Sequence, residues 1–523
     1  MSTERRNFLR LTALGLAGGA LAARYEAAMA ASADAHFDIR SFGASGDGKT
    51  IDSPAINRAI AAAAAAGGGV VRAPAGTYAC YSIRLASFVT LFLDPGSIIL
   101  AAAPPGYDAA ESNAPWEAYQ DFGHNHWHNS LIWGENLHDV ALVGPGRIWG
   151  RGLSRGEWAE AGLPPADAPG AGDKAIALKR CRNVILRDFS ILAGGHFGIL
   201  ATGVDNLAID GISIDTNRDG MNIDACRNVH VSNCSVNSPA DDGICLKSSF
   251  ALGEARATEN VTISGCHVTG YELGTMLDGS FKRAAATPRA PMGRIKLGTE
   301  SNGGFSNISI SNCTFESCRG FALETVDGGT VEDISFTGVT MRDIRNAPFF
   351  LRLGARLRGP PGITVGTLRR IIISDVVCDA PANEMPAIIS GIPGHPIEDV
   401  TISNVYLVQR GGGSAERAAI DPPEEAKDYP EPSRFGPLPA QALFVRHARN
   451  LAIDHLEIAS TSPDARPVCW LRDVEGAAFT RFKSPPNGSG AAFLLEDTHR
   501  FRLAASPPLP DMTLDTVRQK ALP

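Results

Sequence analysis

The 523-residue sequence lacks the features that define several common protein classes. Its ten cysteines form no Cys-x-x-Cys pair, which disfavours a zinc site. Aromatic residues are few, at 7%, and no low-complexity linker divides the chain into two domains. No helical pattern separates most of its strand-like segments, which disfavours a doubly wound α/β fold. A formal net charge of −8 argues against nucleic acid as a partner.

A repeat of alternating apolar and polar residues dominates what the sequence does contain. With Val184, Leu207 and Val229 as markers, the unit returns after 23 and then 22 residues, a spacing typical of a stacked solenoid. Further units follow as ENVTISGCHV, SNISISNCTF, VEDISFTGVT, RRIIISDVVC, IEDVTISNVY and RNLAIDHLEI. Each unit is typical of one coil whose apolar residues stack on those of the next coil. The sequence therefore predicts an all-β fold, a right-handed parallel β-helix.

The part of the chain ahead of the first coils has the pattern of a short helix. Asp52 or Ser53 is a suitable N-cap, Pro54 stands at the first helical position, and glycines follow the apolar run. We expect this helix to cover the open apolar end of the solenoid. We expect a single β-helix domain over residues 36–483 and a tail over residues 484–523.

Residues 1–35 have the pattern of an export signal. Arg5 and Arg6 precede an apolar run rich in Gly and Ala, as in twin-arginine signals. The apolar run is too short for a membrane-spanning helix. Cleavage after Ala30 or Ala35 fits the small-x-small rule. The sequence predicts a periplasmic or secreted protein with no membrane span in its mature form.

Two further patterns concern the interior and one long connection. Cys234, Cys266 and Cys313 occupy one place in the repeat, which predicts an interior stack of small apolar side chains. Disulfides are compatible with export, but the spacing does not select partners. The Pro-rich stretch from Asp421 to Pro439 is expected to form a long loop before a further coil.

Three carboxylates stand at coil spacing. Asp219 and Asp241 are 22 residues apart, about one coil, and Asp242 adjoins Asp241. Neighbouring coils of a parallel β-helix lie about 4.8 Å apart. Asp-Gly pairs are common at turns, but here two such motifs coincide at coil spacing. The sequence therefore predicts that the three carboxylates converge on the outer wall.

These motifs resemble the signature of glycoside hydrolase family 28, the polygalacturonases and their relatives. The matching residues are Asn217-Arg218-Asp219-Gly220, Asp241-Asp242 and the continuation Ile244 to Ser248. The resemblance runs from about Phe37 to at least Asn404 and implies a pectin-degrading enzyme that cleaves galacturonosyl linkages with inversion. It implies that Asp242 is the general acid, while Asp219 and Asp241 activate the attacking water. Crowded carboxylates fit such roles, since one of them is driven to hold a proton.

Two departures from the family pattern bear on the substrate. Met292-Gly293-Arg294 stands where the family has Gly-His-Gly before the strand LGTES. The family's Arg-Ile-Lys motif, which grips a galacturonate carboxylate, is expected one coil later, where Ala322-Leu323-Glu324 stands. Arg294-Ile295-Lys296 spells the same tripeptide one coil too early. We nevertheless expect Arg294 and Lys296 to point into the cleft, because alternate residues of a strand share a face.

The segment His124-Asn125-His126-Trp127-His128 has three imidazoles at alternate positions, a pattern compatible with a metal site. No carboxylate or cysteine nearby completes an obvious site, so we expect neither a metal nor a cofactor. We expect a loop over the cleft instead, in which Trp127 stacks on a sugar. Arg352 belongs to a basic stretch that offers a further cation to an acidic sugar.

The sequence thus predicts a monomeric glycoside hydrolase that acts on a pectin-like polysaccharide. The expected catalytic residues are Asp242, Asp219 and Asp241, and the expected substrate-binding residues are Asn217, Lys247, Arg294, Lys296, Trp127 and Arg352. A rhamnogalacturonan or another polysaccharide remains open as the substrate. One alternative is a polysaccharide lyase on the same fold, with the three aspartates as Ca²⁺ ligands. Another is a solenoid that binds carbohydrate without turnover.

Overall fold

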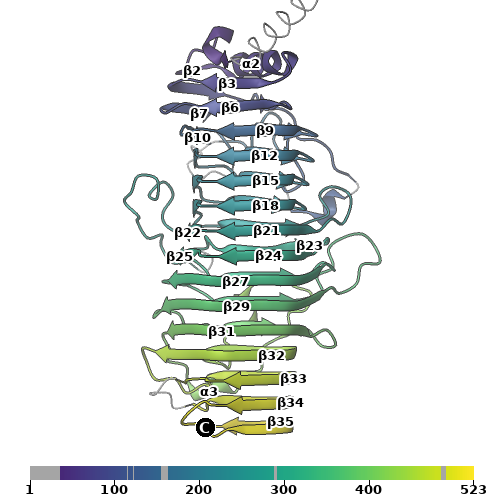
Figure 1. Ribbon diagram of the computed structural model, residues 1–523, viewed down its shortest axis with the longest axis vertical. Coiled ribbons are helices and arrows are strands. Elements are labelled where there is room, and N and C mark those ends of the chain that lie inside the picture. The colour runs from purple at the N-terminus through teal and green to yellow at the C-terminus, as the bar shows by residue number, and fades with distance from the viewer. Residues whose placement is uncertain (1–35, 115, 122, 155–162, 288–290, 485–489) are drawn as a thin grey trace, which may run out of the picture.

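The computed structural model describes residues 36–523 except 115, 122, 155–162, 288–290 and 485–489. The described chain winds into a long parallel β-helix, with successive coils stacked along the vertical axis of Figure 1. In the first two thirds of the helix each coil has three strands, and equivalent strands of successive coils pair in parallel. The predicted parallel β-helix is confirmed.

The strands form three faces, which we call A, B and C. Face A, which carries the site described below, consists of β5 (Ile83–Arg84), β8 (Ser130–Glu135), β11 (Lys174–Lys179), β14 (Phe197–Thr202), β17 (Asp219–Asp224), β20 (Ile244–Ser248), β23 (Ile295–Ser301), β26 (Phe321–Thr325), β28 (Phe349–Leu353) and β30 (Ala387–Ser390). Face B consists of β1 (His36–Asp38), β3 (Gly69–Ala73), β6 (Val89–Leu93), β9 (His138–Val143), β12 (Arg182–Arg187), β15 (Asp205–Asp210), β18 (Arg227–Ser232), β21 (Thr258–Ser264) and β24 (Phe305–Ser311).

Face C consists of β2 (Asp47–Ile51), β4 (Gly76–Cys80), β7 (Ser97–Ala101), β10 (Arg147–Trp149), β13 (Ser190–Leu192), β16 (Ser213–Asp215), β19 (Ser235–Asn237), β22 (His267–Thr269) and β25 (Thr314–Glu316). Longer strands then run through more than one face: β27 (Thr330–Arg342), β29 (Thr367–Ala380), β31 (Ile397–Gln409), β32 (Leu443–Ser460), β33 (Cys469–Thr480), β34 (Phe493–Ala504) and β35 (Met512–Leu522). Short helical turns lie at η1 (Ile39–Phe42), η2 (Glu117–Tyr119), α3 (Ala415–Ala418) and η3 (Pro432–Phe435).

The spacing of the sequence repeat matches the register in which the parallel strands pair. Val184 pairs with Leu207, and Leu207 pairs with Val229, in the parallel strands β12, β15 and β18. These side chains are buried in one continuous core that runs along the inside of the helix. All ten cysteines lie in the described part of the chain and are buried free thiols. The predicted interior stack that contains Cys234 and Cys266 is confirmed.

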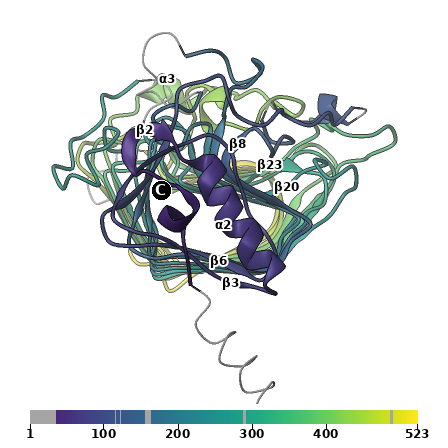
Figure 2. The same ribbon diagram turned by 90° about the horizontal axis from the view of Figure 1, so that it is seen from above.

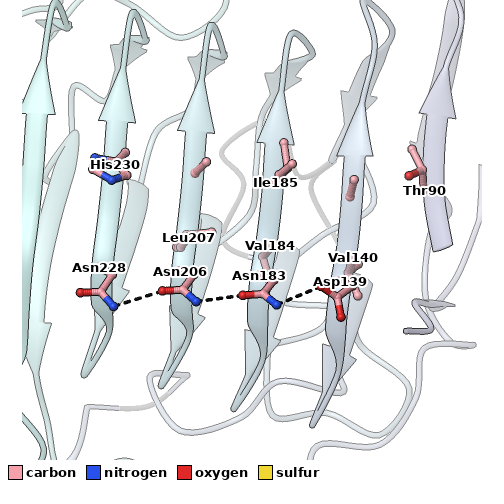
Figure 3. Close-up of a pocket in the computed structure, with 12 residues that line it drawn as sticks. Thr90, Asp139, Val140, Asn183, Val184, Ile185, Asn206, Leu207, Asn228 and His230 are labelled. Carbon is pink, nitrogen blue, oxygen red and sulfur yellow. Dashed lines mark hydrogen bonds between the residues drawn. The ribbon is translucent and has the colours of Figure 1, made fainter. Parts of the chain in front are cut away.

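A ladder of amides runs along the outside of face B. The side chain of Asn206 donates to Asn183 at 2.8 Å and accepts from Asn228 at 3.1 Å, and Asn183 donates to Asp139 at 2.9 Å (Figure 3). Each of these residues has φ between 55° and 56°, the left-handed region that Asn tolerates better than other non-glycine residues. The ladder therefore ties successive coils together at the point where the chain bends into the strand.

The N-terminal end of the solenoid is covered as expected. Helix α2 (Ser53–Ala65) lies across this end (Figure 2) and buries Ile56, Ala59 and Ile60 against the core. Its N-cap is Asp52, whose carboxylate accepts from the backbone N–H groups of Ser45 and Gly46 and not from the helix. The cap residue thus ties the helix to the preceding turn.

The C-terminal end differs from the prediction. Residues after 484 were expected to form a tail, but β34 pairs in parallel with β33, and β35 pairs with β34 in antiparallel fashion. The alternating apolar residues Phe493, Leu495, Phe501 and Leu503 are buried in the core. The β-helix therefore continues beyond residue 483 and ends in an antiparallel strand.

No helix of the described residues is long and apolar enough to cross a membrane. The predicted export signal over residues 1–35 lies outside the described residues.

The asparagine ladder yields a stability prediction. Replacing Asn206 by Ala removes two side-chain hydrogen bonds and places a poorly tolerated residue at φ 55°, so we expect a loss of about 1–3 kcal/mol. Asn206→Gly removes the same hydrogen bonds but keeps the backbone conformation favourable. Urea unfolding followed by circular dichroism should give a lower midpoint for Asn206→Ala than for Asn206→Gly. Equal midpoints would contradict the backbone argument.

Candidate active site

The three predicted carboxylates meet on the outside of face A. Asp219 begins β17, and Asp241 and Asp242 stand in the turn before β20. Met221 pairs with Ile244, so the coil here contains 23 residues and Asp242, not Asp241, stands opposite Asp219. The backbone N–H of Asp242 donates to Oδ1 of Asp219 at 3.3 Å. One carboxylate oxygen from each of the three residues lies within 4.8 Å of the other two.

Asp242 is held in its ionised form by two cations. Nε of Arg294 donates to its Oδ1 at 2.8 Å, and Nζ of Lys296 lies 3.3 Å from its Oδ2. Burial raises the pKa of Asp242, but the charges of Lys296 and Arg294 outweigh burial and hold that pKa below its ordinary value. A carboxylate in this position accepts a proton with difficulty. The general-acid role expected of Asp242 stays a prediction.

Asp219 has the opposite electrostatic surroundings. Its side chain is buried, and Nδ2 of Asn222 donates to its Oδ2 at 2.8 Å. Burial, together with the charge of Asp241, raises the pKa of Asp219 well above its ordinary value. Asp241 is partly exposed and pairs with Nη2 of Arg218 at 2.9 Å. In contrast to Asp242, Asp219 has surroundings that favour the protonated form.

Arg294 and Lys296 are buried beside the three aspartates, and their partners are acidic side chains of the chain itself. Nζ of Lys296 lies 3.5 Å from Oε2 of Glu324, and Nη2 of Arg294 lies 3.9 Å from its Oε1. Glu324 stands where the family's Arg-Ile-Lys motif was expected, and Lys296 pairs with Ala322 in the neighbouring strand. The two cations are buried and lie between the carboxylates of Asp242 and Glu324.

A second ion-paired group forms the far side of the site. Nζ of Lys247 donates to Oε2 of Glu300 at 2.7 Å, and Nη2 of Arg358 donates to the other oxygen of Glu300 at 2.7 Å. Nδ1 of His124 lies 4.0 Å from Glu300. Burial lowers the pKa of His124 well below its ordinary value, so its ring is neutral. The His196 ring lies beside it, with ring centroids 5.9 Å apart.

These groups enclose two adjoining cavities. The inner cavity, of about 210 Å³, is lined by the three aspartates together with Asp121, His124, His196, Arg218, Lys247, Glu300 and Tyr429. The outer cavity, of about 690 Å³, is lined by Arg218, Ala240, Asp241, Met292, Arg319, Tyr429, Glu431, Ser433 and Arg434. Because Arg218, Asp241 and Tyr429 line both, the two cavities form one continuous groove with the carboxylates at the junction.

Two of the predicted binding residues, Trp127 and Arg352, lie elsewhere than expected, while the binding role of Asn217 stays a prediction. The Trp127 side chain is fully buried, donates to Oγ1 of Thr202 at 3.0 Å and is covered by Lys179 at 4.3 Å from the ring centroid, so it offers no face to a sugar. The Arg352 side chain is buried and donates to Oγ of Ser390 at 2.8 Å. Asn217 is buried, and its carbonyl oxygen accepts from the N–H of Ala240 at 3.2 Å. Trp127 and Arg352 are therefore corrected to structural roles.

Sequence reasoning missed several residues of the groove. Glu300 belongs to the LGTES strand, which resembles the family's strand end. That match could have identified Glu300 as a residue of the groove. His124 was noted only as one of three histidines in a cluster. Tyr429 lies in the Pro-rich loop, where no local pattern marks a residue that reaches the site.

Comparisons with known proteins agree with this fold. Residues 169–283 match the family described as right handed beta helix region, and residues 36–127 match rhamnogalacturonase A/epimerase, pectate lyase-like. A probable polygalacturonase of Vitis vinifera is 25% identical over 395 residues, which cover 70% of this chain and 73% of that protein. One from Arabidopsis thaliana is 24% identical over 329 residues, which cover 59% of each chain.

Solved structures show the same architecture. The family 28 exopolygalacturonase of Yersinia enterocolitica superposes with a TM-score of 0.61 at 18% identity, covering 84% of this chain and 77% of that chain. A hyperthermoactive exopolygalacturonase from Thermotoga maritima superposes with a TM-score of 0.51 at 15% identity, covering 94% and 96%. These findings show a right-handed parallel β-helix protein whose sequence is similar to probable polygalacturonases.

Proposed function

We propose that the protein is a glycoside hydrolase that cleaves galacturonosyl linkages in pectic polysaccharide. The observation that carries the proposal is the convergence of Asp219, Asp241 and Asp242 in a groove, with surroundings that raise the pKa of Asp219 and lower the pKa of Asp242. Pairs of carboxyl groups with divergent pKa values are what acid/base hydrolysis of a glycosidic bond requires. The related polygalacturonases support the choice of linkage.

The surroundings assign a role to each carboxyl group. Asp219 carries the proton and donates it to the glycosidic oxygen as the bond from that oxygen to the anomeric carbon breaks. Water attacks the anomeric carbon and gives its proton to the carboxylate of Asp242, beside which Asp241 stands. Compared with the roles implied by the family resemblance, Asp219 and Asp242 are exchanged, because Arg294 and Lys296 keep Asp242 ionised.

A calcium-dependent lyase is the less favoured alternative. The three aspartates have the oxygen donors that Ca²⁺ prefers, and so do Asp121 and Glu300 beside His124. The first group already contacts Arg294 and Lys296, and Glu300 already contacts Lys247 and Arg358. These cations repel a divalent ion, so the charge balance favours hydrolysis.

We further propose that the protein is exported by the twin-arginine route and acts in the periplasm or outside the cell as a monomer. The Arg5-Arg6 pair ahead of an apolar run supports the route. An extracellular polymer as substrate is consistent with that location.

The first prediction of this function concerns the acid/base pair. We expect Asp219→Asn and Asp242→Asn each to lower kcat/KM for polygalacturonate by about 10²–10⁴-fold, because each removes one acid/base group. Release of reducing ends measures the activity, and circular dichroism checks the fold. Asp188→Asn, at an exposed position outside the groove, is the matched control and should keep full activity. Substantial activity in either test variant would refute its catalytic role.

The second prediction concerns the pH dependence of kcat/KM. Asp242 must be ionised, so activity appears as the pH rises through its lowered pKa; Asp219 must be protonated, so activity disappears as the pH rises through its raised pKa. Replacing Lys296 by Met, or Arg294 by Gln, removes a charge that lowers the pKa of Asp242. We therefore expect the acidic limb to move to higher pH in both variants.

The opposite assignment predicts a different shift. If Asp242 were the proton donor, the same substitutions would raise the pKa of the donor and move the basic limb to higher pH. Movement of the basic limb with an unchanged acidic limb would therefore overturn the exchanged roles.

A further inference from the structure

The outward-facing side chains of face A form a continuous row along the helix. The register aligns Leu200, Asn222, Cys245, Lys296, Ala322 and Phe350 in successive strands from β14 to β28. Asp219 begins β17, and Asp242 stands in the turn just before β20. A polysaccharide that crossed the site along the helix axis would have to lie on this row, so whatever covers the row limits the path of the substrate.

On the N-terminal side, the segment before β8 covers the row. Trp127 packs on Ala177 of β11 and on Leu200 of β14 in a small buried cluster. Its indole donates to Thr202, which is the last residue of β14. Face A is therefore buried under the chain itself immediately before β17, the strand that begins with Asp219.

On the C-terminal side, the Pro-rich loop covers the row. Phe435 and Leu438 pack on the outward residues Ala322, Phe350 and Phe444 of face A. The loop is held by buried arginines that donate to its carbonyl oxygens: Arg352 to Glu424 at 2.7 Å, and Arg446 to Pro423 at 2.6 Å. Between these two covers, the groove is open only beside β17, β20 and β23, where Asp219, Lys247 and Glu300 line the inner cavity.

A third contact closes the inner cavity on the side near the end of β23. Arg358 pairs with Asp121 at 2.6 Å and with Glu300 at 2.7 Å. Arg358 lies between β28 and β29, and Asp121 precedes β8, so this arginine joins two distant insertions behind the inner cavity. The inner cavity, of about 210 Å³, is smaller than the roughly 300 Å³ at which pockets for drug-sized ligands begin, so it suits one sugar ring rather than a chain.

We propose that the enzyme acts at the ends of its polysaccharide substrate and removes a terminal sugar held in the inner cavity. This inference rests on the proposed function and adds to it the mode of attack. The outer cavity holds the neighbouring sugars; it is lined by Arg218, Arg319 and Arg434 together with the acidic partners Asp241 and Glu431. The bond that is cut lies at the junction of the two cavities, beside Asp241. A chain that continued in both directions would collide with Trp127's segment or with the Pro-rich loop.

The product pattern of the wild-type enzyme tests the proposal. On unbranched polygalacturonate we expect a single small product from the first minutes, with reducing ends released while the viscosity stays nearly constant. A ladder of oligosaccharides with a steep early fall in viscosity would overturn end-directed action while leaving hydrolysis itself intact.

A binding experiment separates this proposal from the proposed function. The Asp242→Asn variant is titrated with polygalacturonate and with the same mass of polymer cut into short oligosaccharides. End recognition predicts that binding per unit mass rises in proportion to the number of chain ends. Equal binding per unit mass would overturn it. If the wild type hydrolysed no pectic polymer, the proposed function would fail, and this titration would still decide whether ends are recognised.

The Arg358 contact offers a variant test. Arg358→Ala removes the link between the two insertions, so we expect a severalfold larger share of longer products and a faster fall in viscosity per bond cut. Arg256→Ala is the matched control, because Arg256 pairs with the partly exposed Asp205 at the same 2.6 Å but outside the groove, and it should leave the product pattern unchanged. An unchanged pattern in Arg358→Ala would overturn the role of this contact in closing the cavity.

Discussion

The close stacking of parallel coils is the constraint on which the rest of the structure depends. Equivalent residues of adjacent coils lie about 4.8 Å apart, so side chains that are 23 residues distant in the sequence become direct neighbours. Apolar side chains that point inward stack on one another at this spacing and form one continuous hydrophobic core. On the outside, the same spacing forces Asp219 against Asp242. Crowded carboxylates repel one another. Only protonation of a carboxyl group or cations from neighbouring coils can relieve this repulsion, and the site uses both.

The cations that relieve this repulsion come from an unexpected coil. The tripeptide Arg294-Ile295-Lys296 lies one coil earlier than the family pattern would place it, and Glu324 stands at the usual position. Arg294 and Lys296 consequently lie between Asp242 and Glu324 and contact both. In this chain Arg294 and Lys296 hold the pKa of Asp242 below its ordinary value. In the outer cavity, Arg218 pairs with Asp241 and Arg319 pairs with Glu431.

Sequence analysis predicted the features that depend on the repeat. The spacing of Val184, Leu207 and Val229 gave the coil register, and the coincidence of Asp219 with the Asp241-Asp242 pair gave the centre of the site. Features that depend on the long insertions were not accessible, because no period relates an insertion to the surface on which it folds. The burial of Trp127 and the contact of Tyr429 with the groove are examples. The charge state of Asp242 was also missed, since it depends on Arg294 and Lys296, which lie in the adjacent coil but follow a long insertion in the sequence.

The central claim is that the proton of the carboxylate cluster resides on Asp219 and that Asp242 is ionised. Infrared difference spectroscopy at mildly acidic pH detects the C=O stretch of a neutral carboxyl group and can be compared between the wild type and single Asp→Asn variants. The account predicts that Asp219→Asn removes the band of a buried neutral carboxyl group and that Asp242→Asn leaves a neutral carboxyl band in place. Loss of the band in Asp242→Asn, with its retention in Asp219→Asn, would contradict the account.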